Sequence, residues 1–309
     1  MVETPVLFET YIRVETSRKV WDAIKNAKPK KLYFYNNKAL LDSPDDIAKN
    51  NEIRSWVREV DWDCEVHTFF RDVQVNQYES LLGSKQWLFE NEESGIILED
   101  DCVPSLGFFE FCDHFLNVYA DNKKISFISG NNYSRGYSPQ TSDDHIISLS
   151  QLHFGWATWK DRWNDIDWEL MPTKVIDSGA FEVYYPKFYV RWFYKLMFKR
   201  LEPFIKNTHC WDYLWTLNCI YKDKYEVSPT KNLVQNIGLY GEHANGGNNY
   251  LFKATIDADS HYDFKNDTCS IIPNYEYDYY ELKSLGNRCS LLSKIRLCIN
   301  YIKYLRGTL

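Results

Sequence analysis

The sequence predicts an α/β protein in which a mixed, mostly parallel sheet is flanked by helices, with a helix-rich C-terminal portion. In the first third of the chain short apolar runs alternate with helical patterns, which favours right-handed crossovers and a parallel sheet. From about residue 178 to 221 the pattern is mainly helical. A length of 309 residues suits one large α/β domain, alone or with an appended subdomain.

The strands expected in the first half of the chain are short apolar runs that stop at polar segments. They are expected at residues 6–12, 31–35, 65–70, 95–98 and 125–129, with a further strand near 146–149. The fourth ends abruptly at three acidic residues. In parallel sheets, ligands bind at the carboxyl ends of the strands, so these acids are expected at a binding edge.

Helices between these strands begin at residues that are typical of N-caps. Thr16 or Ser17 is expected to cap the first helix. Ser43 is expected to cap the second, because Pro44 follows it and suits a first helical turn. Ser105 is expected to start a third helix that carries several phenylalanines.

Composition and charge exclude some classes of function. The net charge of −7 argues against a general nucleic-acid binder, which needs a basic surface. The 11 Trp, 23 Tyr and 18 Phe serve mainly as core residues, although aromatic faces also pack against sugar rings. No apolar run approaches the length of a membrane span, and the start of the chain shows no secretory signal.

The eight cysteines form no Cys-x-x-Cys pair, and no histidine lies at zinc-finger spacing from them. Free thiols in a reducing cytosol are therefore expected, which predicts a cytoplasmic protein.

The acidic triplet Glu99-Asp100-Asp101 is the main candidate for a functional site. Adjacent carboxylates repel one another, and burial without a partner would raise their pKa values. A divalent cation, Mg²⁺ or Mn²⁺, would remove that conflict, because hard cations bind carboxylate oxygen. The alternative is a turn whose acids cap the helix that begins near Ser105. Spacing alone leaves both interpretations open.

Several segments, in order, resemble one enzyme family. Residues 97–105, Ile-Leu-Glu-Asp-Asp-Cys-Val-Pro-Ser, resemble the metal-binding segment of GT-A (Rossmann-like) glycosyltransferases. The resemblance is to the bacterial haemolysin-like, or nucleotide-diphospho-sugar transferase, group, which is related in pattern to the N-acetylglucosaminyltransferase I family. Residues 128–132, 155–159 and 232–238 also match. Arg13-Val14-Glu15-Thr16 matches an Arg-Pro-Glu-x-Thr segment, with Val14 in place of proline.

The resemblance implies a metal-dependent hexosyltransferase that moves a sugar from a nucleotide-diphosphate donor, expected to be a UDP-sugar, to a saccharide acceptor. It implies a GT-A catalytic domain over residues 1–240, with the nucleotide-sugar half at about 1–132 and the acceptor half at about 133–240. A C-terminal extension would follow over 241–309. The segment 76–78 departs from the family, because it lacks an Asn-x-Gly pattern.

On the donor side, the resemblance implies that Asp101 binds the metal and that Asp100 approaches the ribose or the metal. Glu99 would lie beside the donor sugar. Arg13 and Asn37 would line the nucleotide pocket. Arg54 is a further candidate for this pocket, although it is equally well read as a helix surface residue.

On the acceptor side, the resemblance places the general base at Asp212, which follows Trp211 in a Trp-Asp segment. An inverting transfer needs such a carboxylate to take the proton of the acceptor hydroxyl. Read without the family, Asp212 is an acid in the first turn of a helix. Gly155, Trp156 and Trp211 would wall the acceptor or the donor sugar. Trp156 and Trp159 can be read as sugar walls or equally as core anchors.

His243 marks a second departure from the family. The family places a histidine some residues after Asn-Ile-Gly, but the aligned position here holds Gly246, and His243 comes three residues earlier. His243 either replaces the missing metal ligand by a loop shift or is an ordinary solvent-facing residue.

The last part of the chain predicts a basic amphipathic helix over residues 291–306. Leu291, Ile295, Cys298, Ile302 and Leu305 share one helical face, and lysines and arginines surround it. Such a helix can lie on the inner face of an anionic membrane, which would suit a lipid-linked glycan acceptor. It can equally dock on the protein itself.

Two other classes of protein remain as alternatives. A sugar nucleotidyltransferase would be expected to carry a glycine-rich phosphate loop after its first strand, and residues 10–14 supply none. A catalytically inactive glycan-binding module could retain the same fold and the same aromatic residues. The complete acidic triplet together with Asp212 argues against the second alternative.

Overall fold

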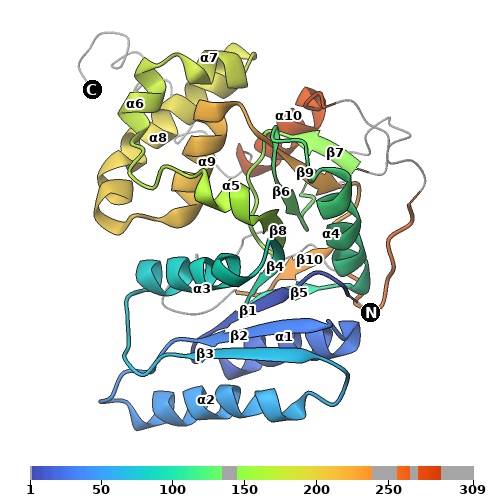
Figure 1. The fold of residues 1–309 in the computed structure, drawn as a ribbon. Helices are drawn as coiled ribbons and strands as arrows, with labels where there is room; N and C mark the ends of the chain where they lie inside the picture. Colours follow the sequence, from blue (N-terminus) through green and yellow to red (C-terminus); the bar gives the residue numbers. More distant parts are fainter. Residues whose placement is uncertain (1, 134–144, 239–255, 265–270, 287–309) are drawn as a thin grey trace.

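An eight-stranded sheet forms the centre of the protein, with helices on both of its faces (Figure 1). The structure is a computed structural model and describes residues 2–133, 145–238, 256–264 and 271–286. The strand order is β3-β2-β1-β4-β8-β6-β9-β7. The strands are β1 (Val6–Thr10), β2 (Lys31–Asn36), β3 (Glu65–Phe70), β4 (Ser94–Glu99), β6 (Ile125–Ser129), β7 (His145–Ser148), β8 (Trp156–Trp159) and β9 (Tyr225–Pro229).

The sheet is mixed and mostly parallel, as the sequence predicts. The pairs β1/β2, β2/β3, β1/β4 and β6/β9 are parallel. Strand β8 runs antiparallel between β4 and β6, and β7 runs antiparallel to β9 at the edge. Strands β1, β2, β3, β4, β6 and β9 therefore end at the same edge of the sheet. A second, two-stranded antiparallel sheet pairs β5 (Cys102–Pro104) with β10 (Val234–Asn236).

Successive side chains of a strand point to opposite faces of the sheet, so the core consists of two layers, one on each face. Val6 and Phe8 of β1 face a layer that contains α1 and α4, whereas Leu7 faces a layer that contains α3 and α9. This period of two is what a sheet covered on both faces requires. The helices are α1 (Val14–Ala27), α2 (Pro44–Ser55), η1 (Trp56–Glu59), α3 (Gln77–Asn91), α4 (Leu106–Val118), α5 (Lys160–Asn164), α6 (Pro172–Asp177), α7 (Ala180–Tyr184), α8 (Phe188–Thr208), α9 (Trp211–Lys222) and α10 (Tyr275–Gly286).

Helices α6 to α9 form the helix-rich portion, which sits beyond the α3 face of the sheet (Figure 1). They share a third apolar cluster, in which Leu214 and Leu217 of α9 are fully buried. Other residues of α9 belong to the layer on the sheet, so α9 joins the two cores. The prediction of a helical C-terminal portion is confirmed for this segment.

Of the N-caps expected for the first two helices, one is confirmed and one is wrong. Ser43 caps α2 as expected, since its side chain accepts a hydrogen bond from the Asp46 N–H. The expected cap of the first helix is wrong: α1 begins at Val14, with Arg13 at the N-cap, and Ser17 is buried inside the helix. The helix starts before both expected cap residues, so Ser17 lies on its buried face together with Val20 and Ile24.

Two elements that position the site were not expected from the sequence. Helix α3 begins at Gln77, and the side chain of its N-cap, Asn76, accepts a hydrogen bond from the Glu79 N–H. Strand β8 inserts between β4 and β6 in the antiparallel direction. A short apolar run such as Trp156–Trp159 can equally be read as a buried helix segment, so periodicity alone does not identify β8 as a strand.

The described parts of the chain after residue 255 pack on the sheet layers. The Gly107 N–H of α4 donates to the Ser260 carbonyl (2.8 Å), and the Tyr262 ring lies edge-on to Phe111. Asp278 of α10 accepts hydrogen bonds from Ser148 and from the Leu149 N–H. The predicted tail helix over 291–306 lies outside the described residues. No helix within them is long and apolar enough to cross a membrane.

The cysteines that the structure describes are unpaired, as expected. Cys102, Cys112 and Cys219 are buried, and Cys64 and Cys210 are half-buried.

Candidate functional site

The candidate site lies where β1, β2 and β4 end side by side. Glu9 of β1 is the register partner of Glu99 of β4, and Thr10 is that of Asn36 of β2. The acidic triplet therefore begins at the end of β4, beside the end of β1. Of all the expectations about the site, its position at the carboxyl edge of the sheet follows most directly from the strand pattern.

Arg13 joins the two aspartates of the triplet. Its Nε lies 3.2 Å from Asp100 Oδ2, its Nη2 donates to Asp100 Oδ1, and its Nη1 lies 3.0 Å from Asp101 Oδ2. Both aspartates are nearly buried, with 5% of Asp100 and 9% of Asp101 exposed. One guanidinium is thus shared between two carboxylates.

Burial disfavours the ionised forms of Glu99 and Asp100. Burial raises the pKa of Asp100 to about 7, against the opposing effect of Arg13, and the nearby Asp101 raises it further. Burial raises the pKa of Glu99 to about 8, with Lys85 opposing and Glu9 adding to the rise. Clusters of this kind are typical of sites that receive a cation or a proton.

The backbone around Asp101 is fixed by the segment that contains β10. The Ile237 N–H donates to the Asp101 carbonyl (2.8 Å), and Asn236 Oδ1 accepts from the Gly238 N–H (2.9 Å). A Cβ at Gly238 would lie 2.3 Å from Asp101 Oδ2. Gly238 is therefore required for the close approach of this turn to the carboxylate.

The donor set suits a hard divalent cation that is shared with a phosphate-bearing ligand. Asp101 offers carboxylate oxygens, with Asp100 as its neighbour. In the described residues no group of three or more His, Cys, Asp or Glu side chains is arranged to hold a metal ion by itself. Mg²⁺ commonly binds through one or two carboxylates, with phosphates and water completing the shell, so the residues fit that mode. His243 lies outside the described residues.

The two nucleotide-pocket candidates on the β2 side differ in how their polar groups are used. Asn37 donates to the Val75 carbonyl (2.9 Å) and accepts from the Lys38 N–H (3.0 Å), so it shapes the adjoining loop. Arg54 donates to Asn36 Oδ1 (2.7 Å) and to the Arg71 carbonyl (2.8 Å).

Arg54 is a charged group without a carboxylate among its hydrogen-bond partners in the described part of the chain. Those partners are neutral oxygens, and its guanidinium lies 5.3 Å from the centre of the Phe70 ring. Burial lowers the pKa of Arg54, with Asp72 opposing. The arrangement leaves its positive charge able to interact with an anion.

The segments that resemble the transferase family converge on one another. The Gly130 N–H donates to the Gly155 carbonyl, and the Leu233 N–H donates to the Gly130 carbonyl, both at 2.9 Å. Gly155 has a φ of +77° and lies against Val234, where a Cβ would meet a methyl group at 2.8 Å. Only glycine fits this backbone and this contact. These segments support the turn that reaches Asp101.

Asp212 lies in the first turn of α9 and is half-buried. Its Oδ1 accepts hydrogen bonds from the Tyr213 N–H (2.8 Å) and the Cys210 thiol (2.9 Å). Its Oδ2 has no hydrogen-bond partner in the part of the chain that the structure describes. Burial and the neighbouring Asp212 raise the pKa of Cys210, and the more distant Glu99 contributes to this rise. The charge of Glu99 therefore reaches the thiol that donates to Asp212.

The predicted sugar-wall tryptophans occupy different environments. Trp156 is fully buried, and its ring stacks on Trp211 with centroids 5.4 Å apart and planes 16° apart. In this structure Trp156 supports Trp211 from within the core. Trp211 keeps 6% of its surface exposed at the start of α9.

Sequence reasoning missed Glu9 and Lys85. The Lys85 ammonium lies 2.8 Å from both carboxylate oxygens of Glu9, and 4.5 Å from the centre of the Trp211 ring. A glutamate inside an otherwise apolar strand is a signal that could have been followed. Lys85 could not have been found, because α3 itself was not expected.

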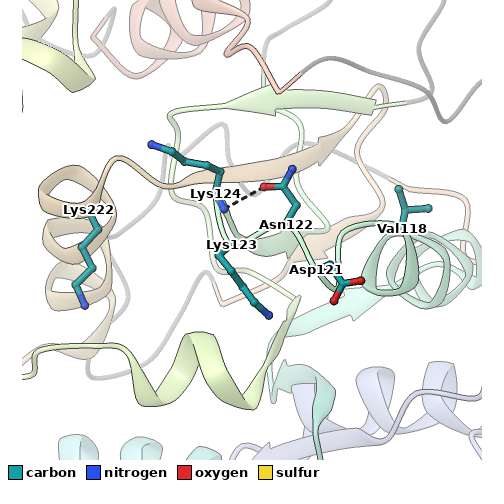
Figure 2. A pocket seen from close by; sticks show the side chains of 6 residues that line it. All are labelled: Val118, Asp121, Asn122, Lys123, Lys124 and Lys222. Carbon is teal, nitrogen blue, oxygen red and sulfur yellow. Dashed lines mark hydrogen bonds between the residues drawn. The ribbon is translucent and has the colours of Figure 1, made fainter.

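A separate hollow of about 590 Å³ lies where α4 ends and β6 begins (Figure 2). Because β6 starts there, the hollow is at the opposite edge of the sheet from the triplet. Its lysines are paired with acids: Lys123 with Asp161 (2.6 Å), Lys124 with Asp223 (2.5 Å) and Lys222 with Asp165 (3.0 Å). Figure 2 also shows the Lys124 N–H bonded to Asn122. Paired surface lysines offer little charge to a ligand.

Comparison with known proteins finds low similarity only. No family model matches the chain, and no curated protein matches it. Similar solved structures include HddC from Yersinia pseudotuberculosis, with 8% identity, 51% of this chain and 77% of that chain covered, and a TM-score of 0.32. The apo-form glycosyltransferase GlyE of Streptococcus pneumoniae TIGR4 has 11% identity and a TM-score of 0.31, over 74% of this chain and 45% of its own.

An apo-form UDP-glucose pyrophosphorylase has 8% identity and a TM-score of 0.34, over 74% of this chain and 90% of its own. Of the GlyE chain, by contrast, this chain spans less than half. TM-scores at this level identify neither a family nor an activity.

Proposed function

We propose that this chain is a metal-dependent glycosyltransferase that moves a sugar from a nucleoside-diphosphate donor, a UDP-sugar, to a saccharide acceptor. The observation that carries the proposal is the buried pair Asp100 and Asp101, bridged by one arginine at the carboxyl edge of a mostly parallel sheet. Ligands of parallel α/β proteins bind at this edge. Asp212 supplies a further carboxylate, bonded to the Cys210 thiol on which the charge of Glu99 also acts.

On the donor side, Asp101 would hold Mn²⁺ or Mg²⁺ together with the diphosphate. The cation would neutralise charge on the departing nucleoside diphosphate. Asp100 would contact the ribose or the metal, and Glu99 would lie beside the donor sugar. Arg13 is placed to exchange one of its carboxylate contacts for a diphosphate oxygen, because it is 39% exposed while both aspartates are nearly buried. Arg54 would add a positive charge on the nucleotide side.

On the acceptor side, Asp212 would act as the general base of an inverting transfer. The acceptor hydroxyl attacks the sugar carbon from the face opposite the diphosphate, and its proton passes to the carboxylate. The two hydrogen bonds to Oδ1 fix the carboxylate and leave Oδ2 to take the proton. Trp211 and the loop at Gly155 would wall the saccharide. The acceptor would be a glycan or a lipid-linked glycan.

A panel of nucleotide sugars, incubated with candidate saccharide acceptors in Mn²⁺ or in EDTA, tests the proposal. We expect a nucleoside diphosphate to be released from one donor, only in the metal. Release or consumption of pyrophosphate would indicate a nucleotidyltransferase instead. Saccharide binding without release of any nucleoside diphosphate would indicate a glycan-binding module.

The variant Asp212→Asn tests the base. Asparagine keeps the shape of the side chain but removes the proton acceptor, so kcat should fall by about 10² to 10⁴. Nucleotide binding in Mn²⁺ should stay within about threefold of wild type, because Asp212 lies on the acceptor side. A kcat unchanged by this substitution would assign the base elsewhere.

A further inference from the structure

A fully buried ion pair links the acidic edge of the sheet to the helix that carries Asp212. The Lys85 side chain is 0% exposed and that of Glu9 is 2% exposed. The ammonium lies 2.8 Å from each oxygen of Glu9 and 3.3 Å from the Leu81 carbonyl. Ser84 donates a further hydrogen bond to Glu9. The pair is therefore fixed in one geometry.

Stability does not account for this pair. Burying two charges costs desolvation free energy that their attraction often fails to recover, and an apolar pair of similar volume is commonly as stable or more stable. Helix α3 is already anchored on the sheet by Leu88 and Phe89, which are buried in the same layer as Leu7. A role beyond joining α3 to β1 is needed.

Besides Glu9 and the Leu81 carbonyl, Lys85 contacts the ring of Trp211, and this contact suggests a further role. Its ammonium lies 4.5 Å from the centre of the Trp211 ring, a distance at which a cation is attracted to the aromatic face. Trp211 is the first residue of α9, and Asp212 follows it. The ring is also stacked on the buried Trp156. Glu9 thus fixes Lys85, and Lys85 with Trp156 fixes the residue next to Asp212.

We propose that Lys85 is a positioning residue that holds the start of α9 against the sheet edge and so aims the Asp212 carboxylate at the donor site. In the contacts that the structure describes, Lys85 makes no hydrogen bond with the acidic triplet, and only its charge reaches Glu99. The inference rests on the proposed function for the role of Asp212 as base. Its structural part, that the pair orders residues 210–212, stands apart from any activity.

The double variant Glu9→Gln/Lys85→Met removes both charges with side chains of similar length. Because both members of the pair become neutral, neither is left as an unpaired buried charge, and the variant should fold. The matched control is Glu92→Gln/Lys31→Met. That variant removes the Lys31–Glu92 pair (2.8 Å), which joins β2 to the end of α3. In the contacts that the structure describes, this second pair does not touch α9.

The thiol of Cys210 reports the order of the start of α9 without any turnover. It donates to Asp212 and is half-buried, while Cys64 is a half-buried thiol beside β3 and serves as the internal reference. Alkylation of both thiols would be followed by peptide mass spectrometry. We expect the Cys210-to-Cys64 rate ratio to rise about 5- to 10-fold in the double variant, since local opening exposes the thiol. The control should leave the ratio unchanged.

Steady-state kinetics of the double variant then test whether Lys85 positions Asp212 for catalysis. A misplaced base lowers turnover without weakening donor binding, so kcat should fall about 10- to 100-fold while the donor KM stays within about threefold. An unchanged Cys210 ratio would overturn the inference, as would a loss confined to donor KM. A wild-type chain without transferase activity would refute the proposed function, but the Cys210 result would still decide whether the pair orders α9.

Discussion

The substitution Gly238→Ala places a methyl group against the proposed metal ligand. Its Cβ would lie 2.3 Å from Asp101 Oδ2 and 3.1 Å from Asp101 Cγ. A relaxed carbon–oxygen contact needs about 1 Å more than the shorter of these distances, so the carboxylate or the turn must move by about that amount. The hydrogen bond from the Ile237 N–H to the Asp101 carbonyl resists movement of the backbone. The carboxylate is therefore the part expected to shift.

Two magnitudes follow from that shift. Overpacking of this kind costs about 1–3 kcal/mol of stability, which leaves a folded protein. A displacement of about 1 Å in a site can cost about 100-fold, equivalent to about 2.7 kcal/mol. We therefore expect the affinity for a nucleoside diphosphate in Mn²⁺ to fall about 100-fold. Weak binding in EDTA should change far less, because it does not use the metal.

Isothermal titration of the wild type and the variant, in Mn²⁺ and in EDTA, measures both affinities. The matched control is Gly83→Ala, whose Cβ would lie 2.4 Å from the flexible end of Arg71. The nominal overlap is almost the same, but the long side chain can move away. Equal metal-dependent affinity in wild type and Gly238→Ala would refute the assignment of Asp101 as a metal ligand.

Three further substitutions test the charges around the site and in the fold. Arg13→Gln should destabilise the metal-free protein by about 1–2 kcal/mol. It should also increase the thermal stabilisation of the protein by Mn²⁺, because the metal then replaces the lost guanidinium. A smaller stabilisation by Mn²⁺ than in wild type would contradict this. Arg54→Gln should weaken nucleotide binding by about tenfold in Mn²⁺ and in EDTA alike, measured by the same titrations, whereas an effect seen only in Mn²⁺ would place Arg54 near the metal. Hydrogen bonds, the strongest from Arg18, lower the pKa of Glu59 from 4.5 to about 2, so its stabilisation is present above pH 4.5 and is lost as the pH falls towards 2. Glu59→Gln should therefore lower the free energy of urea unfolding by about 1 kcal/mol at pH 7, a value reduced for its partial exposure, and the difference should narrow below pH 4.5.

The parts of the fold that the sequence predicted are those with a simple period. Strands β3 and β6 have the expected bounds, because each is a run of β-formers that stops at a polar residue. Ser43 was identifiable as a cap because Pro44 follows it. Helix α3 lacked such a signal: its buried residues include Ser80, Ser84 and Lys85, so its inner face does not read as apolar.

The site, too, was predictable only where a clear pattern in the sequence marks it. The acidic triplet was identifiable because three charges directly follow an apolar strand. The Arg13 bridge depends on the exact start of α1, which the cap residues placed wrongly. The link from Glu9 through Lys85 to Trp211 joins three elements that are distant in the sequence, and only the packed structure brings them together.

The central claim is that the acidic triplet forms a metal-dependent nucleotide site. Thermal unfolding of the wild type and of Asp101→Ala, with a series of nucleoside diphosphates in Mn²⁺ or in EDTA, tests it most directly. Ligand at about 100 times its Kd stabilises the native state by about 2.7 kcal/mol. We expect one nucleotide to stabilise the wild type by about this amount in Mn²⁺, to do so weakly in EDTA, and to lose the metal-dependent part in Asp101→Ala. Equal stabilisation of both proteins in Mn²⁺, or stabilisation by no nucleotide, would contradict the claim.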